Sequence, residues 1–338
     1  MHKIFRVFQK AYHLALRLIK EIRHFPGQYR EFGWEVAKET FIDGLIPPGK
    51  REKYINTISS YVDTYLSDII EKYEDYSHAE TDLYGQKRTG KLPIWCCWWQ
   101  GIETMPEIVR MCHDRLKQVI PEDRAELRLI TLNNYREYVD IPEHIVKKFQ
   151  SGIITMTTMS DVLRFELLYK YGGYWLDATV FFTGEIPEEY FTEKFHCQRM
   201  ADPVKWKREA CKGNWCGFSM AGNKGNFLFA YMRECFAKWW KDYDSIIDYV
   251  LIDYFLLSAY KHIPAATEII NSVPDNNEDI FELYTVLNQP YTEELYRKLT
   301  RRNVMHKLTY KMDLQKVTAD NRITLYGYLL KMVYGELR

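Results

Sequence analysis

The chain has 338 residues, and its 46 Lys and Arg residues balance 46 Asp and Glu residues, which argues against general nucleic-acid binding. No apolar run reaches the roughly 18 residues of a membrane span, and the first residues lack the uninterrupted apolar segment of a signal peptide. The seven cysteines contain no CxxC arrangement and indicate reduced thiols, so we expect a cytoplasmic protein.

Residues 3 to 25 are predicted to form a basic amphipathic helix. Its apolar stripe comprises Phe5, Phe8, Tyr12, Leu16, Ile19 and Ile22, and its basic residues are Lys3, Arg6, Lys10, Arg17, Lys20 and Arg23. Two interpretations are equally open. Either the helix packs on the body of the protein with a solvated basic face, or residues 1-25 contact an anionic membrane at its inner face.

A second helix is predicted near residues 54 to 73, where apolar residues recur at the same spacing. Residues 77 to 91 are polar and contain glycine, which is typical of a linker. We therefore expect a helical N-terminal extension over residues 1-90 and a catalytic domain over residues 91-338.

The catalytic domain is predicted to begin with a strand over residues 94 to 101, followed by a helix after Pro106. A second strand over 127 to 132 and a short helix over 142 to 149 continue the pattern. Strands that alternate with helices are typical of an open α/β sheet, and such sheets bind ligands beyond the carboxyl ends of their strands.

A helix and a strand that carry three charged residues follow. Ser160 is predicted to cap the helix and Asp161 to lie in its first turn, while the double glycine at 172–173 ends it. Asp177 lies in the apolar strand that comes next, where an unpaired carboxylate would be costly, so we expect it to face a crevice or a cation. Asp161 and Arg164 are three residues apart on one side of the helix and could reach that crevice.

The motif Ser-Asp-x-x-Arg, followed by Tyr-Gly-Gly-x-Trp-x-Asp, resembles the DxD-motif, sugar-binding glycosyltransferases with a glycosyltransferase-A fold, specifically the capsular polysaccharide synthesis branch. The resemblance implies an α/β fold with an open mixed sheet flanked by helices. It also implies retaining transfer from a nucleotide-sugar donor to a glycan or lipid-linked oligosaccharide acceptor. Thr179 stands where the second aspartate of DxD would be, and a hydroxyl is a weaker ligand for a hard cation.

Two strong helices are predicted later, over residues 226 to 240 and 245 to 260. Asp253 lies in an apolar stretch of the second, where an unpaired charge would be expensive, so it is a better candidate than Asp248 for the acceptor site. The resemblance points to the same aspartate. It also suggests that residues 215 to 222 form an acceptor-side strand and loop, although an ordinary strand with a glycine turn fits equally well.

Near the end, residues 304 to 310 bring His306 and Lys307 together, with Lys311 just beyond. By resemblance, this segment closes over the diphosphate. His306 would then be a metal ligand and Lys307 or Lys311 a phosphate contact, whereas a lone histidine is usually a core or surface residue.

Taken together, the resemblance implies three sets of site residues. The catalytic set is Asp161, Arg164, Asp177 and Asp253. The donor-binding set is Trp99, Gln100, Ser160, Asp161, Arg164, Gly173 and Lys307, with Trp99 and Gln100 at the nucleobase. The set for a weakly held Mn²⁺ or Mg²⁺ is Asp177, Thr179 and His306. The alternative function is a sugar-nucleotide-binding protein without turnover. A purely structural interpretation also explains each central residue singly, with Ser160 as a helix cap, Asp161 and Arg164 as an ion pair, and Asp177 as a turn carboxylate.

Overall fold

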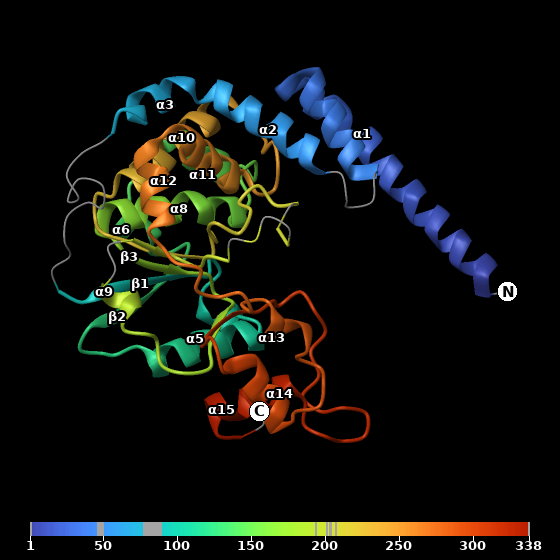
Figure 1. Cartoon of the computed structure of the whole chain (residues 1–338), viewed down its shortest axis with the longest axis vertical. Helices are drawn as coiled ribbons and strands as arrows, with labels where there is room; N and C mark the ends of the chain where they lie inside the picture. Colours follow the sequence, from blue (N-terminus) through green and yellow to red (C-terminus); the bar gives the residue numbers. More distant parts are fainter. Residues whose placement is uncertain are drawn as a thin grey trace.

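The computed structural model describes residues 2–45, 51–76, 90–192, 195–200, 202, 205–206 and 208–336. Its centre is a five-stranded sheet in the order β2-β1-β3-β6-β5 (Figure 1). β1 (Leu92–Cys97) is parallel to β2 (Ala125–Ile130) and β3 (Gly173–Leu176), whereas β6 (Ser219–Gly222) is antiparallel to β3 and β5 (Phe195–Cys197). A two-stranded sheet pairs β4 (Val180–Phe182) antiparallel with β7 (Met305–Lys307). The predicted open mixed sheet is confirmed.

Helices flank the sheet on both faces (Figure 1). On one face α8 (Met156–Tyr171) contacts β1 and β3, α10 (Phe227–Asp242) packs on α8, and α11 (Leu251–His262) packs on α10. On the other, α5 (Glu107–Val119) contacts β4 and α15 (Leu325–Tyr334). Shorter helices connect these: η1 (Ile102–Thr104), α6 (Tyr135–Tyr138), α7 (Glu143–Gln150), α9 (Glu189–Thr192), α12 (Pro264–Asn271), α13 (Glu282–Thr285) and α14 (Glu293–Thr300).

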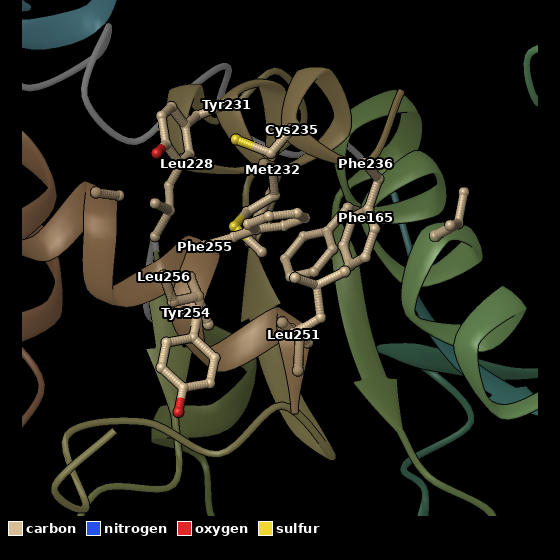
Figure 2. Packing of buried hydrophobic residues seen from close by; sticks show 14 of the residues in the cluster. Phe165, Leu228, Tyr231, Met232, Cys235, Phe236, Leu251, Tyr254, Phe255 and Leu256 are labelled. Atoms are coloured by element: carbon tan, nitrogen blue, oxygen red, sulfur yellow. The ribbon is translucent and has the colours of Figure 1, made fainter. Parts of the chain in front are cut away.

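Aromatic side chains hold the first helical layer together (Figure 2). The ring of Phe236 on α10 lies 6.1 Å from that of Phe165 on α8 and 5.0 Å from that of Phe255 on α11. All three are buried, and burial of each such side chain contributes roughly 1.5–3 kcal/mol. This packing fixes α8 and α11 relative to each other, and both helices carry candidate site residues.

The predicted second helix is in fact two helices, α2 (Arg51–Tyr65) and α3 (Ser67–Glu74), which meet at Leu66. Ile58, Val62 and Leu66 are fully buried in the same core as α10 and α11. Residues 51–76 therefore share a core with α10 and α11. Most of the predicted linker, residues 77–89, lies outside the described residues.

The N-terminal helix α1 (His2–Leu45) consists of two segments that meet at Gly33, whose φ of 82° favours glycine. Phe25 in the first segment contacts Phe41 in the second, with ring centroids 5.9 Å apart, so the chain turns back on itself. Residues ahead of this contact extend away from the body of the protein (Figure 1). Among the described residues, no helix is both long and apolar enough to cross a membrane.

The predicted apolar stripe is exposed wherever its side chains are described. Tyr12 is 64% exposed, Leu16 and Ile19 are each 46% exposed and Ile22 is 55% exposed; the side chains of Phe5 and Phe8 lie outside the described set. Packing of this stripe on the body, one of the two interpretations, is therefore not observed for the described side chains.

Two boundaries differ from prediction for identifiable reasons. The first strand ends at Cys97, so Trp99 and Gln100 lie in the turn beyond it. The helix predicted from residue 245 begins instead at Leu251, because Asp248 binds other partners. Its buried carboxylate accepts hydrogen bonds from Tyr54 at 2.8 Å and from the backbone N–H of Val250 at 3.2 Å. That local bond favours a turn over a helix.

Candidate functional site

A pocket of about 580 Å³ opens where the chain leaves β1 and β3, beside α8. Its walls include the start of α8, the residues after β3 and the turn after β1. The segment 307–311 closes one side, and residues 249–253 at the start of α11 form another. The location agrees with the general rule that open α/β sheets bind ligands beyond the carboxyl ends of their strands.

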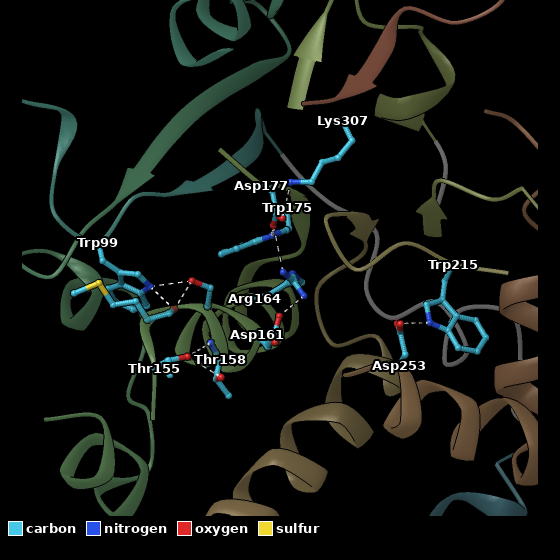
Figure 3. Close-up of polar contacts among 12 residues, drawn as sticks. Trp99, Thr155, Thr158, Asp161, Arg164, Trp175, Asp177, Trp215, Asp253 and Lys307 are labelled. Carbon is cyan, nitrogen blue, oxygen red and sulfur yellow. Dashed lines mark hydrogen bonds and ion pairs between the residues drawn. The ribbon is translucent and has the colours of Figure 1, made fainter. Parts of the chain in front are cut away.

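Asp177 is the centre of the polar network in this pocket (Figure 3). Its Oδ1 accepts hydrogen bonds from Trp175 Nε1 at 2.9 Å and from Arg164 Nη2 at 3.3 Å. Its Oδ2 accepts from Lys307 Nζ at 3.1 Å, and Arg164 Nη1 donates to Asp161 Oδ1 at 2.9 Å. The three charged residues predicted to converge do converge, with Lys307 as a fourth.

The local sequence explains how α8 presents these side chains. The helix starts one turn earlier than predicted, because Thr155 caps it and accepts a hydrogen bond from the N–H of Thr158 at 3.2 Å. Ser160 is therefore not the cap; it donates to the carbonyl of Met156 at 2.8 Å inside the helix. Its predicted role as a cap is wrong, although it lines the pocket.

Gly173 serves packing at the start of β3. Its φ is 100°, and a Cβ atom there would lie 2.3 Å from the carbonyl oxygen of Pro93 in β1. Any other residue would push the two strands apart. Gly173, predicted as a donor contact, does not line the pocket.

The two carboxylates on the α8 side of the pocket have different electrostatic environments. Burial would raise the pKa of Asp177, but Lys307, Arg164 and the Trp175 N–H favour the anion and lower the pKa to about 2. For Asp161 burial dominates, and its pKa rises to about 6 despite the contact with Arg164. Asp177 thus remains anionic at neutral pH, and Asp161 lies much closer to protonation.

The two residues predicted at the nucleobase both line the pocket. Trp99 is only 4% exposed, and its N–H donates to Ser160 Oγ and to the carbonyl of Met156, each at 2.8 Å. It therefore braces the first turn of α8 and offers the pocket little surface. Gln100 is exposed beside Trp99, so it offers the pocket more of its side chain than Trp99 does.

Asp253 faces the same pocket from the first turn of α11, across from α8 (Figure 3). Trp215 Nε1 donates to its Oδ1 at 3.0 Å. Burial raises the pKa of Asp253 to about 7; the indole N–H opposes this rise, whereas Asp161, Glu209 and Asp248 add to it. Asp253 lines the pocket, whereas Asp248 does not.

The residues predicted to hold a metal do not assemble as a cation site. Asp177 Oδ2 and Thr179 Oγ1 face a common point, but Lys307 Nζ lies there, 2.5 Å from the threonine hydroxyl. His306 is fully buried and does not line the pocket; its Nε2 lies 3.4 Å from Thr183 Oγ1. Over the described ranges, no group of three His, Cys, Asp or Glu residues could hold a metal ion. Between Asp177 and Thr179, the Lys307 ammonium group occupies the point that a divalent cation would take.

Several aromatic residues line the pocket that the sequence did not single out as site residues, among them Trp175 and Tyr249. Trp175 donates to Asp177, and the guanidinium of Arg164 lies over its ring, 5.0 Å from the centroid. The spacing could have revealed it, since residues two apart in a strand share a face. Tyr249, 68% exposed at the rim, follows the turn at Asp248 and carried no such signal.

Comparison with known proteins gives one match and one negative result. The profile of the family described as "Capsular polysaccharide synthesis protein" matches residues 48–329. The matched span begins just before α2 and includes every candidate site residue. No curated protein matches the chain.

Proposed function

The chain belongs to the capsular polysaccharide synthesis protein family, and from this premise we propose that it is a glycosyltransferase. It would move a sugar from a nucleotide-sugar donor to a glycan acceptor during the synthesis of a cell-surface polysaccharide. The observation that carries the proposal is the network around Asp177, in which one carboxylate and two cations meet at the end of a parallel strand. Retention of configuration at the anomeric carbon is the expectation from the resemblance.

The chemistry of such a transfer suits the arrangement of charges. The departing diphosphate gains negative charge, and Arg164 and Lys307 are the cations nearest the centre of the network. Asp161 and Asp177 offer carboxylate oxygens to sugar or ribose hydroxyls, which orients the donor. Asp253 lines the opposite side of the pocket and would accept a hydrogen bond from the acceptor hydroxyl.

A screen of nucleotide sugars by thermal unfolding tests the donor class, since a bound donor stabilises the folded state. At a free concentration about 100 times its Kd, a donor raises the free energy of unfolding by about 2.7 kcal/mol. We expect one nucleotide sugar to raise the melting temperature more than the corresponding free sugar and to yield its nucleoside diphosphate on incubation with acceptor glycans.

Stabilisation without release of the nucleoside diphosphate would instead indicate a binding protein without turnover. If no nucleotide sugar raises the melting temperature, with or without manganese, the transferase assignment is wrong.

We also propose that the exposed segment of α1 attaches the protein to the inner face of an anionic membrane, where lipid-linked acceptors would lie. Exposed apolar residues, Leu14, Leu16, Leu18, Ile19 and Ile22 among them, share this segment with exposed Arg17, Lys20 and Arg23. Basic residues near an anionic surface contribute on the order of 1 kcal/mol each, and the apolar residues add to this on burial. The attachment would be reversible.

Co-sedimentation with vesicles tests this attachment. We expect binding to vesicles that contain phosphatidylglycerol, little binding to pure phosphatidylcholine, and weaker binding at high salt. Replacing Leu16 and Ile19 with Gln should remove the binding, whereas Ile153→Gln, which changes a 41% exposed residue on the body, should not. Equal binding to both lipids, or to neither, would contradict the proposal.

A further inference from the structure

The point between Asp177 and Thr179 is where the resemblance places a divalent cation, and an ammonium group lies there instead. Lys307 Nζ is 3.1 Å from Asp177 Oδ2 and 2.5 Å from Thr179 Oγ1. We infer that Lys307 takes the place of the metal, so that the donor diphosphate is bound and neutralised by protein cations alone. This inference rests on the proposed transferase function and deepens it.

The position of Lys307 is set by the backbone around it. In the β4–β7 ladder it lies opposite Val180, three residues after Asp177. The N–H of Leu308 donates to the carbonyl of Thr179 at 2.8 Å, and the N–H of Lys307 donates to the carbonyl of Ile280 at 2.8 Å. The side chain is only 19% exposed. Strand pairing therefore delivers the ammonium group to the motif.

The oxygens that a hard cation would need from the protein are already engaged. Mg²⁺ is usually held by one or two carboxylates together with waters and substrate phosphates. Asp177 Oδ1 already accepts from Arg164 and Trp175, which leaves its Oδ2 and the neutral hydroxyl of Thr179. A divalent ion at that point would also lie against the Lys307 ammonium, and like charges at such a distance repel strongly. The ion would have to displace Lys307.

The two carboxylates and the two cations of the network balance each other before the donor binds. When the donor binds, the cations can contact its diphosphate instead. Asp161 and Asp177 offset Arg164 and Lys307. In the transfer, the bond between the anomeric carbon and the diphosphate oxygen breaks, and its electron pair stays on the diphosphate. The acceptor oxygen forms the new bond to that carbon and its proton passes to a base. Lys307 offsets the charge gained by the leaving group.

Calorimetric titration of the full chain with UDP, GDP and inorganic pyrophosphate tests the inference without relying on turnover. We expect at least one of these probes to bind with a Kd that changes by less than about twofold between EDTA and excess Mn²⁺. Lys307→Met, which keeps the aliphatic stem, should weaken that binding by about tenfold or more. Lys298→Met, the same change on the exposed surface of α14, should not.

A second variant is designed to make binding at the site depend on a metal ion. In Lys307→Met combined with Thr179→Asp, a second carboxylate replaces the hydroxyl and the ammonium is gone. We expect its binding of the same probe to become at least about tenfold tighter with Mn²⁺ than with EDTA. A circular dichroism melt confirms that each variant folds.

The inference is overturned if the unaltered protein binds the probes only with Mn²⁺, or if Lys307→Met binds as well as the unaltered protein does. Failure of all three probes under every condition would overturn the transferase assignment as well, so the two failures are distinguishable.

Discussion

Replacing Asp177 with Asn is expected to reduce sugar transfer by about a thousandfold or more while leaving the protein folded. The carboxylate holds Arg164 and Lys307 at one point with two separate oxygens. An amide of the same shape keeps one acceptor oxygen but presents N–H groups to the other cation, so one contact is lost and one becomes repulsive. The measurement is transfer to an acceptor glycan and, separately, hydrolysis of the donor.

The matched control is Asp63→Asn. Asp63 is also an aspartate with low exposure that binds two basic groups, Lys261 and His262, but it lies on α2 and does not line the pocket. This variant should lose stability and keep its transfer rate. Near-normal transfer by Asp177→Asn would exclude Asp177 from the reaction.

Replacing Asp253 with Asn is expected to lower transfer by about a hundredfold to ten-thousandfold, the usual range for loss of a general base. Because the pKa of Asp253 is raised to about 7, the side chain is protonated below that pH and can accept the acceptor proton only above it. Transfer by the unaltered protein should therefore rise as the pH increases through about 7, and the variant should lose this rise.

The raised pKa of Asp253 also affects the stability of the fold, and this effect changes with pH in the opposite direction to the rate of transfer. A carboxyl group whose pKa is raised in the folded state stabilises that state at low pH, and this contribution is lost as the pH rises through about 7. Trp215→Phe removes the N–H that favours the anion, so it should move the activity profile to higher pH. An unchanged pH profile in Asp253→Asn would show that another group titrates.

The sequence predicted the side of the site that is local in the chain. Asp161 and Arg164 share a helix, and thirteen positions separate Arg164 from Asp177, so helical spacing and strand alternation suffice to bring them together. The start of α8 lies one turn earlier than predicted because Ser160 is the stronger cap by residue type, whereas the backbone geometry puts Thr155 at the cap position.

The contacts that join distant segments could not be predicted in this way. Lys307 and Asp177 are 130 positions apart, and their contact depends on the pairing of β4 with β7. The same pairing separates Lys307 from His306, since neighbours in a strand point to opposite faces. The prediction that His306 and Lys307 belong to one site did not allow for this alternation of side chains along β7. Asp253 was identified because a carboxylate in an apolar helix has to face something polar.

The separation between Asp177 and Lys307 also determines when the site exists during synthesis. Asp161, Arg164 and Asp177 leave the ribosome long before Lys307, so the early chain carries two carboxylates and one cation at the motif. The β4–β7 pairing, in which Phe182 lies opposite Met305, closes a long loop, and long loops close at an entropic cost that local contacts avoid. The pocket is thus among the last parts of the fold to be completed, and a nascent chain that stops before β7 has a motif without its second cation.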